Sequence, residues 1–182
     1  MGNMFGKLFP RRLRRNKIRL VMVGLDGAGK TSIVYHLKRG DCVSMVPTHG
    51  FDVKFVEYNN LTFTIFDVGG KDYLRPLWRH YYHDTHAFIF VVDSSDHGRL
   101  DVVTEEISKL IIEVKKKDAI LLVLANKQDL PSAMSVTNIA EQLRLHSLEK
   151  KNWHIQGSCA ITGDGLSEGM DWLTTQLIKV KI

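Results

Sequence analysis

A glycine-rich segment near the N-terminus has the residues and spacing of a phosphate-binding loop. Residues 24–31 read GLDGAGKT and directly follow the apolar run at residues 18–23. A buried strand that leads into such a turn aims backbone N–H groups, and the positive end of the next helix, at one anion. In this pattern Lys30 reaches the β- and γ-phosphates, and the hydroxyl of Thr31 binds Mg²⁺. We expect the other phosphate contacts to come from Asp26, Gly27, Ala28, Gly29 and Ser32.

A second motif selects the base. Residues 126–129 read NKQD and follow the apolar run at residues 120–125. The carboxylate of Asp129 accepts two hydrogen bonds at once, which matches the ring N–H and exocyclic amine that guanine presents side by side. Adenine has no such donor pair there. The sequence therefore predicts a site for a guanine nucleotide.

A third motif, DVGG at residues 67–70, closes another apolar run. Its carboxylate, Asp67, can hold Mg²⁺ through water, and the N–H of Gly70 can contact a γ-phosphate. Alone, the segment reads equally as a strand-ending turn, but the phosphate loop upstream favours the nucleotide role. Thr48 lies in an earlier loop, where its hydroxyl could complete the Mg²⁺ shell when a γ-phosphate is present. That loop would then be ordered or loosened as GTP is hydrolysed.

The elements that position these motifs alternate between strands and helices. Strand-like apolar runs fall at residues 18–23, 51–58, 61–67, 86–92, 119–125 and 153–158, and helical periodicity falls at about 30–39, 98–114, 135–142 and 164–180. This alternation predicts an α/β fold with a mostly parallel six-stranded sheet and helices on both faces. Only Asn59 and Asn60 join the second and third runs, so we expect a hairpin and one antiparallel edge strand. Most motifs fall at the carboxyl ends of strands, where ligands bind in such sheets.

Composition and charge divide the chain into two parts. The 182 residues suit one domain, which we place at residues 17–182. Residues 1–20 carry seven Lys and Arg and no acid, whereas the rest carries 18 basic and 20 acidic residues. The net charge of +5 therefore belongs to a short basic arm, residues 1–16, that would meet an anionic surface. Two distant cysteines without metal-ligand spacing fit a reducing cytosol.

Taken together, these motifs resemble the Arf family of small GTPases over nearly the whole chain. The likeness rests on the start MGN and on residues 24–31, 47–48, 67–70, 75–82, 126–131 and 159–165. The stretch RPLWRHYY at residues 75–82 is the segment most specific to Arf proteins. The resemblance implies the three-layer P-loop GTPase fold and a switch that binds GTP, GDP and Mg²⁺.

The resemblance also assigns residues to the ligand and partners to the protein. It implies that Asn126 and Lys127 join Asp129 in holding guanine, with the backbone of Cys159 and Ala160 near its carbonyl. It implies that Thr31, Thr48 and Asp67 serve phosphate and Mg²⁺. Expected partners are an exchange factor, a GTPase-activating protein that supplies an arginine, and coat or other effector proteins of vesicle traffic. We expect a monomer that cycles between the cytoplasm and a membrane, either the Golgi, another endomembrane or the plasma membrane. An aromatic trio could form the effector patch, or equally be core: Phe51, Phe66 and Tyr81.

Lys71 departs from the family at the position that usually holds the water-orienting glutamine. A lysine offers only donors and cannot accept a hydrogen bond from the attacking water. We expect impaired GTP hydrolysis. The rival interpretation is that Lys71 neutralises γ-phosphate charge while other groups position the water, and the rival function is a non-hydrolysing GTP-bound scaffold.

The N-terminal arm has the features of a membrane anchor. Gly2 begins a myristoylation motif, although Gly6 replaces the usual Ser or Thr. An apolar helix face of about two turns follows, and then a basic cluster, which together would strengthen the marginal binding of one acyl chain. The alternative is a disordered basic tail that binds RNA or directs nuclear import. We expect no nucleic-acid partner, because the chain lacks aromatic stacking platforms.

Overall fold

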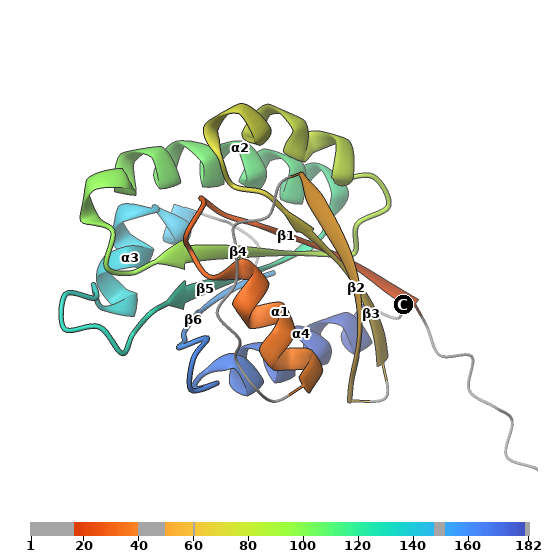
Figure 1. The fold of residues 1–182 in the computed structure, drawn as a ribbon. Helices are drawn as coiled ribbons and strands as arrows, with labels where there is room; N and C mark the ends of the chain where they lie inside the picture. Colours follow the sequence, from red (N-terminus) through yellow and green to blue (C-terminus); the bar gives the residue numbers. More distant parts are fainter. Residues whose placement is uncertain (1–16, 40–49, 60, 148–151, 181–182) are drawn as a thin grey trace, which may run out of the picture.

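The computed structural model describes residues 17–39, 50–59, 61–147 and 152–180, and it forms a three-layer α/β domain (Figure 1). The strands are β1 Lys17–Val23, β2 Phe51–Tyr58, β3 Leu61–Val68, β4 Ala87–Asp93, β5 Ile120–Asn126 and β6 Trp153–Gly157. The α-helices are α1 Lys30–Arg39, α2 Leu100–Lys117, α3 Val136–Gln142 and α4 Leu166–Lys179. Three 3₁₀ helices complete the order: η1 Asp72–Tyr81, η2 His97–Arg99 and η3 Leu145–Ser147.

The six strands form one sheet in the order β2-β3-β1-β4-β5-β6. Only β2 and β3 pair antiparallel, with Phe51 opposite Val68 at one end and Tyr58 opposite Leu61 at the other. All other neighbours are parallel. The predicted fold class, including the hairpin and its antiparallel edge strand, is confirmed. The carboxyl ends of the parallel strands consequently meet at one edge of the sheet.

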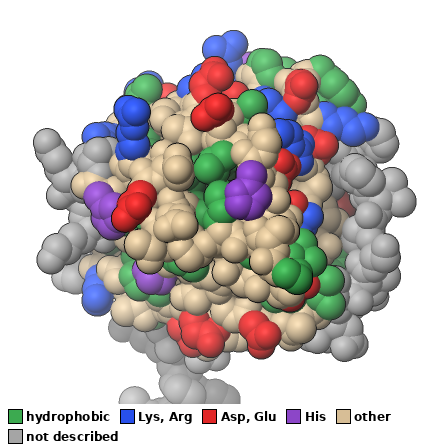
Figure 2. All heavy atoms as spheres, turned by 90° about the vertical axis from the view of Figure 1, so that its left-hand side faces the viewer, with side chains coloured by type: hydrophobic (Ala, Val, Ile, Leu, Met, Phe, Trp, Pro, Cys, Tyr) green, Lys and Arg blue, Asp and Glu red, His purple; other side chains and the backbone are tan. Residues whose placement is uncertain are grey.

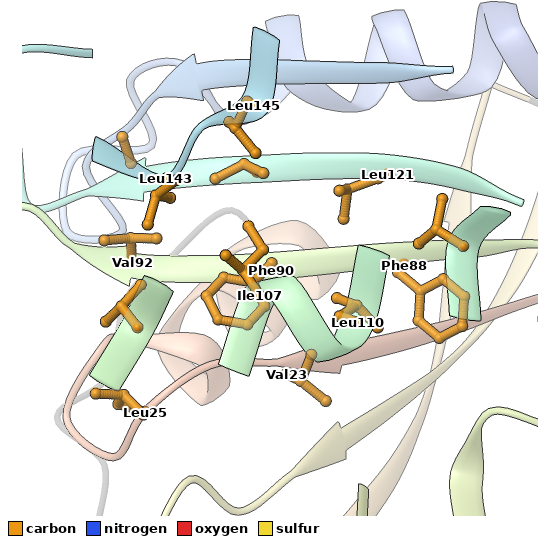
Figure 3. Packing of buried hydrophobic residues seen from close by; sticks show 14 of the residues in the cluster. Val23, Leu25, Phe88, Phe90, Val92, Ile107, Leu110, Leu121, Leu143 and Leu145 are labelled. Carbon is orange, nitrogen blue, oxygen red and sulfur yellow. The ribbon is translucent and has the colours of Figure 1, made fainter. Parts of the chain in front are cut away.

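Two apolar clusters hold the layers together, one on each face of the sheet. Alternate residues of β1 point to opposite faces: Val21 and Val23 belong to one cluster, whereas Leu20 and Met22 belong to the other. Helices α2 and α3 cover the first cluster, and α1 and α4 cover the second. Figure 3 shows the first cluster, where Ile107 and Leu110 of α2 lie against Phe88 and Phe90 of β4. Central strands buried on both faces explain why their sequences are continuous apolar runs.

Some element boundaries differ from the predicted ones. Helix α4 begins at Leu166 rather than near residue 164, because Gly163 and Gly165 have φ of +88° and +74° and cannot continue a helix. The ten-residue η1 was not predicted as an element. Its 3₁₀ geometry lacks the 3.6-residue period, and Pro76 lies inside it. The arm at residues 1–16 lies outside the described residues, as does Thr48. Within the described ranges, no helix is long and apolar enough to cross a membrane.

Candidate guanine nucleotide site

The phosphate loop joins β1 to α1 and lies close against neighbouring strands. A side chain at Gly24 would place its Cβ 2.2 Å from the carbonyl oxygen of Val91, and one at Gly29 would place it 2.3 Å from the amide nitrogen of Asn126. Both glycines also have positive φ, of 146° and 96°. The loop therefore needs glycine at these two positions for space and for backbone conformation. Such a cradle suits a phosphate group, because backbone N–H groups can approach it closely where no side chains intervene.

Lys30 begins α1 and folds back into the loop. Its ammonium donates to the carbonyl oxygens of Gly24 at 2.8 Å and Leu25 at 2.9 Å, and the residue is only 6% exposed. Burial lowers the pKa of Lys30 to about 8, although the carboxylates of Asp67 and Asp26 favour its charged form. The ammonium is thus a buried cation at the place where the sequence predicts the β- and γ-phosphates.

Two residues expected at the magnesium ion meet directly. The hydroxyl of Thr31 on α1 donates to Oδ2 of Asp67 at 2.6 Å, and Asp67 is fully buried at the end of β3. A hydroxyl and a carboxylate are hard oxygen ligands that fit Mg²⁺. These residues would hold the ion, which supplies charge neutralisation to the phosphates when bound.

The segment after Asp67 packs on the phosphate loop. A Cβ on Gly70 would lie 2.3 Å from each of three backbone atoms, the nitrogen of Asp26, the oxygen of Gly24 and the carbonyl carbon of Leu25. The indole N–H of Trp78 donates to the carbonyl of Gly69 at 2.9 Å, and Arg75 Nε donates to the carbonyl of Gly70 at 3.1 Å. Helix η1 therefore holds the DVGG segment in place.

Lys71, at the position of the expected water-orienting group, precedes η1. Its carbonyl accepts from the backbone N–H of Leu74 at 2.8 Å, which fixes the backbone at the start of η1. The residue is half-buried, and it follows directly on the glycine that touches the loop. Its side chain consequently starts beside the phosphate end of the site.

Asn126 ties the phosphate loop to the base-binding side. Its amide nitrogen donates to the carbonyl of Ala28 at 2.8 Å, and its amide oxygen accepts from the backbone N–H of Ala160 at 2.9 Å. Cys159 and Ala160 are buried after β6, whereas Asp129 is exposed. The backbone N–H of Cys159 donates to the carbonyl oxygen of Asp164 at 2.9 Å and so closes the loop between them. The structure thus brings the predicted base residues to one edge of the sheet.

Two ion pairs at this edge of the sheet were not predicted from the sequence. Lys127 Nζ lies 2.5 Å from Oδ2 of Asp93, the last residue of β4. Arg99, at the end of η2, places its Nη1 2.9 Å from Oδ1 of Asp26 in the phosphate loop. The first pair follows from the register of β4 and β5, which sets Asp93 beside Asn126. That register cannot be predicted before the order of the strands in the sheet is known.

The remaining predicted residues divide between described and undescribed parts of the chain. Gly27 is exposed, Ala28 is buried and Ser32 is half-buried, all in or beside the loop. The aromatic trio does come together: Tyr81 has ring centroid distances of 5.0 Å to Phe51 and 6.5 Å to Phe66. Thr48 and Gly2 lie outside the described residues.

The surface at this edge carries charges of both signs. Figure 2 shows the face toward which the carboxyl ends of the strands point, with acidic, basic and apolar side chains intermingled. No single sign dominates the visible described surface. Attraction for a polyphosphate must therefore come from the loop N–H groups and the buried Lys30 rather than from a broad basic patch.

Comparison with known proteins agrees with this geometry. The model of the ADP-ribosylation factor family matches residues 1–177. The structure is similar to that of the Arl6 BBS3 small GTPase from Trypanosoma brucei, solved with the bound nucleotide analogue GppNp. The two chains are 34% identical, the TM-score is 0.83, and the match covers 90% of this chain and 99% of the other. The chain therefore belongs to the ADP-ribosylation factor family of small GTPases, and its site is that of a GTP-binding switch.

Proposed function

We propose that this protein is an Arf-type switch that, once loaded with GTP, recruits effector proteins to membranes in vesicle traffic. The observation that carries the nucleotide-binding part of the proposal is the buried side chain of Asn126, which bonds both the phosphate loop at Ala28 and the base loop at Ala160. The membrane and effector parts rest on the family to which the chain belongs. One residue thereby fixes the spacing between a phosphate site and a base site, as a nucleotide requires. An exchange factor, a GTPase-activating protein and effectors are the proposed partners.

The identity of the nucleotide tests the first part of this proposal. We expect guanine nucleotide, with Mg²⁺ held by Thr31, Asp67 and Thr48, to copurify with the protein and to be displaced by GDP or GTP but not by ATP. Chromatography of the nucleotide released on denaturation gives the answer. Adenine nucleotide in that fraction would contradict the role assigned to Asp129.

We propose further that GTP hydrolysis is impaired by Lys71. The support for this proposal is that the backbone of Lys71 is fixed at the start of η1, directly after Gly70, at the position where the resemblance expects the water-orienting glutamine. Its ammonium can donate to the phosphate, yet it cannot accept from the water, and charge alone does not replace orientation. We expect single-turnover hydrolysis of preloaded GTP to be much faster in Lys71→Gln than in the parent. The rates are measured with and without the domain of an Arf GTPase-activating protein (GAP). Equal rates would show that Lys71 belongs to a different catalytic arrangement.

The second candidate is a scaffold that holds GTP without hydrolysing it. Lys71 favours this candidate too, because a protein that binds GTP and does not hydrolyse it keeps its GTP-bound conformation. The two candidates differ in the response to a GAP domain. Measurable turnover by the parent with the GAP domain identifies a cycling switch, and its absence over many hours identifies the scaffold.

We propose that the arm at residues 1–16 anchors the protein reversibly to anionic membranes from the cytoplasm, through a myristoyl group on Gly2 and the basic cluster. A single acyl chain binds weakly, so the positive charges would supply the remaining affinity. Flotation with liposomes that contain phosphatidylserine, for protein coexpressed with an N-myristoyltransferase, should lose most bound protein in Gly2→Ala. Equal flotation of the two would count against the acyl anchor.

The aromatic trio is the proposed effector patch. Phe51 is 50% exposed at the start of β2, and its ring contacts Tyr81 of η1. The Arg19 guanidinium lies 3.7 Å from the ring centroid of Phe66, which leaves one face of that ring occupied. A partner would therefore meet mainly Phe51 and the rim of Tyr81. Both lie beside segments that touch the phosphate loop, so nucleotide state and patch geometry can be coupled.

A further inference from the structure

We infer that Arg99 is a specificity-determining residue that sets the preference for GTP over GDP by neutralising Asp26 at the γ-phosphate end of the loop. The inference rests on the proposed function, because it concerns the same nucleotide site. It begins from a conflict in the sequence. Asp26 places a carboxylate inside a turn built to bind anions, between Leu25 and the exposed Gly27.

The structure locates Asp26 at one particular end of the loop. Its backbone nitrogen lies 2.3 Å from the position of a Cβ on Gly70, so the two backbones are in direct contact. Gly70 is the residue whose N–H is expected at the γ-phosphate. The carboxylate of Asp26 also acts on Lys30, whose charged form it favours. Asp26 consequently lies where a third phosphate would add negative charge.

Arg99 meets this carboxylate with a fixed geometry. Its Nη1 donates to Oδ1 of Asp26 at 2.9 Å, and its Nη2 donates to the backbone oxygen of the same residue at 3.1 Å. A second acid, Asp96, holds the other side of the guanidinium, where Nε donates to its Oδ2 at 2.6 Å. Asp96 Oδ1 also accepts from the backbone N–H of Arg99 at 3.2 Å. A planar guanidinium tied at both sides keeps its place better than a lysine would.

The ion pair of Arg99 and Asp26 is partly shielded from water, and this shielding determines how strong the interaction is. The side chains of Arg99 and Asp26 are 37% and 39% exposed, so the interaction is neither fully screened nor fully buried. With Arg99 present, the group formed by Asp26, Arg99 and Asp96 carries one net negative charge, because the guanidinium offsets one of the two carboxylates. Without Arg99, the carboxylate would repel the γ-phosphate of GTP more than the more distant phosphates of GDP, because Coulomb energy falls with distance. Loss of Arg99 should thus change the ratio of the two affinities and not only their level.

The test is a double-mutant cycle with full-length protein. Dissociation constants for fluorescent mant-GDP and mant-GppNHp are measured with Mg²⁺ for the parent, Arg99→Gln, Asp26→Asn and the double variant. We expect Arg99→Gln to weaken GppNHp relative to GDP about tenfold, the order given by one uncompensated charge in a partly screened site. Asp26→Asn should restore the ratio in the double variant, since a neutral residue 26 needs no partner. The change should grow as ionic strength falls.

Three further variants keep the result interpretable. Lys109→Gln removes one positive charge that pairs with Glu105 and Glu106 on α2, and it should leave the ratio unchanged. Arg99→Lys retains the charge and should recover part of the lost preference. Asp26→Asn alone should raise the preference for GppNHp, because one negative charge is removed from the loop while Arg99 stays paired with Asp96. This expectation holds even if Arg99→Gln does not fold.

The outcomes separate this inference from the proposed function. Equal weakening of both nucleotides in Arg99→Gln, or no restoration by Asp26→Asn, would show that Arg99 only supports the loop and would overturn the inference. A parent protein that binds neither GDP nor GppNHp would overturn the proposed function as well. GDP binding with an unchanged ratio in every variant would overturn the inference alone.

Discussion

The amide nitrogen of Asn126 donates to the carbonyl oxygen of Ala28 at 2.8 Å and so joins two segments that are 98 residues apart. The amide oxygen of the same side chain accepts from Ala160 N, and Asn126 is only 1% exposed. Both partners are backbone groups of loops that the nucleotide is expected to touch. Asn126 therefore acts as a spacer between the phosphate loop and the loop at Ala160, in addition to its expected contact with the base.

Replacing this spacer should loosen the whole site. Asn126→Ala leaves a buried carbonyl and a buried N–H without their partners, and each loss costs about 1–3 kcal/mol. We expect GDP to dissociate at least tens of times faster and the melting temperature to fall. Stopped-flow release of mant-GDP and differential scanning calorimetry measure the two effects. Asn152→Ala is the matched control, because that amide donates an exposed bond of 3.3 Å to Asp118. Comparable GDP release from the two variants would refute the spacer role.

Lys30 should couple nucleotide binding to proton uptake. Its pKa is about 8 in the folded chain against 10.5 for an ordinary lysine. Bound phosphates favour the charged ammonium and raise that pKa, so binding at about pH 9 should take up a proton. Calorimetric titration with GDP in two buffers of different ionisation enthalpy reveals the uptake. Lys38→Gln, a change at an exposed lysine of the same helix, should leave it unaltered. Binding heats that do not depend on the buffer at this pH would contradict the prediction.

The same shift has a consequence for folding. Below pH 8 Lys30 is charged in both the folded and unfolded chains, so the cost of burying the charge is fully present, about 3 kcal/mol at 1.36 kcal/mol per pKa unit. Between pH 8 and 10.5 the unfolded chain binds more protons than the folded chain. The contribution of this group therefore makes nucleotide-free protein more stable as pH rises through that window. Urea denaturation of the parent and Lys30→Met should show this pH dependence in the parent only.

Gly70 should tolerate no side chain. A Cβ there would lie 2.3 Å from three backbone atoms of the phosphate loop, and backbone cannot move aside as a flexible side chain can. Gly70→Ala should push the DVGG segment off the loop, weaken GppNHp at least tenfold more than GDP, and lower the melting temperature. Gly98→Ala serves as the control, since the nearest atom to its added Cβ is 3.9 Å away. Unchanged GppNHp binding in Gly70→Ala would mean that the segment can move away without loss.

Two exposed aromatic residues of β2 offer a matched test of the effector patch. Phe51 is 50% exposed and Phe55 is 62% exposed, and both lie on one face of an edge strand. The ring of Phe51 contacts that of Tyr81, whereas Phe55 lies four residues farther along the strand. Each change to alanine should alter the free energy of unfolding by no more than about 1 kcal/mol. Binding of an Arf effector domain to GppNHp-loaded protein, followed by calorimetry, should fall at least tenfold in Phe51→Ala and little in Phe55→Ala. Equal losses would place the contact along the whole strand.

The strands and the loop were predictable because their signals are local. The central strands β4 and β5 are apolar runs whose side chains are buried on both faces, and the two-residue link between β2 and β3 leaves a hairpin as the only connection. Helix η1 was not predictable in this way, since its ten residues depend on the contacts of Trp78 with Gly69 and of Arg75 with Gly70. Gly70 is itself held against the backbone of the phosphate loop, more than 40 residues earlier in the chain, and no pattern within η1 encodes that contact.

The sequence by itself determined which segments are the candidates for binding phosphate, guanine and magnesium, because these motifs work through backbone groups and side chains set by short spacings. Only the tertiary structure decided how the charges among them are balanced. Asp26 and Arg99 are 73 residues apart, and Asp93 and Lys127 are 34 apart, yet each pair meets at the carboxyl edge of the sheet. The strand order and the crossover connections create that proximity, and no spacing within one segment encodes it.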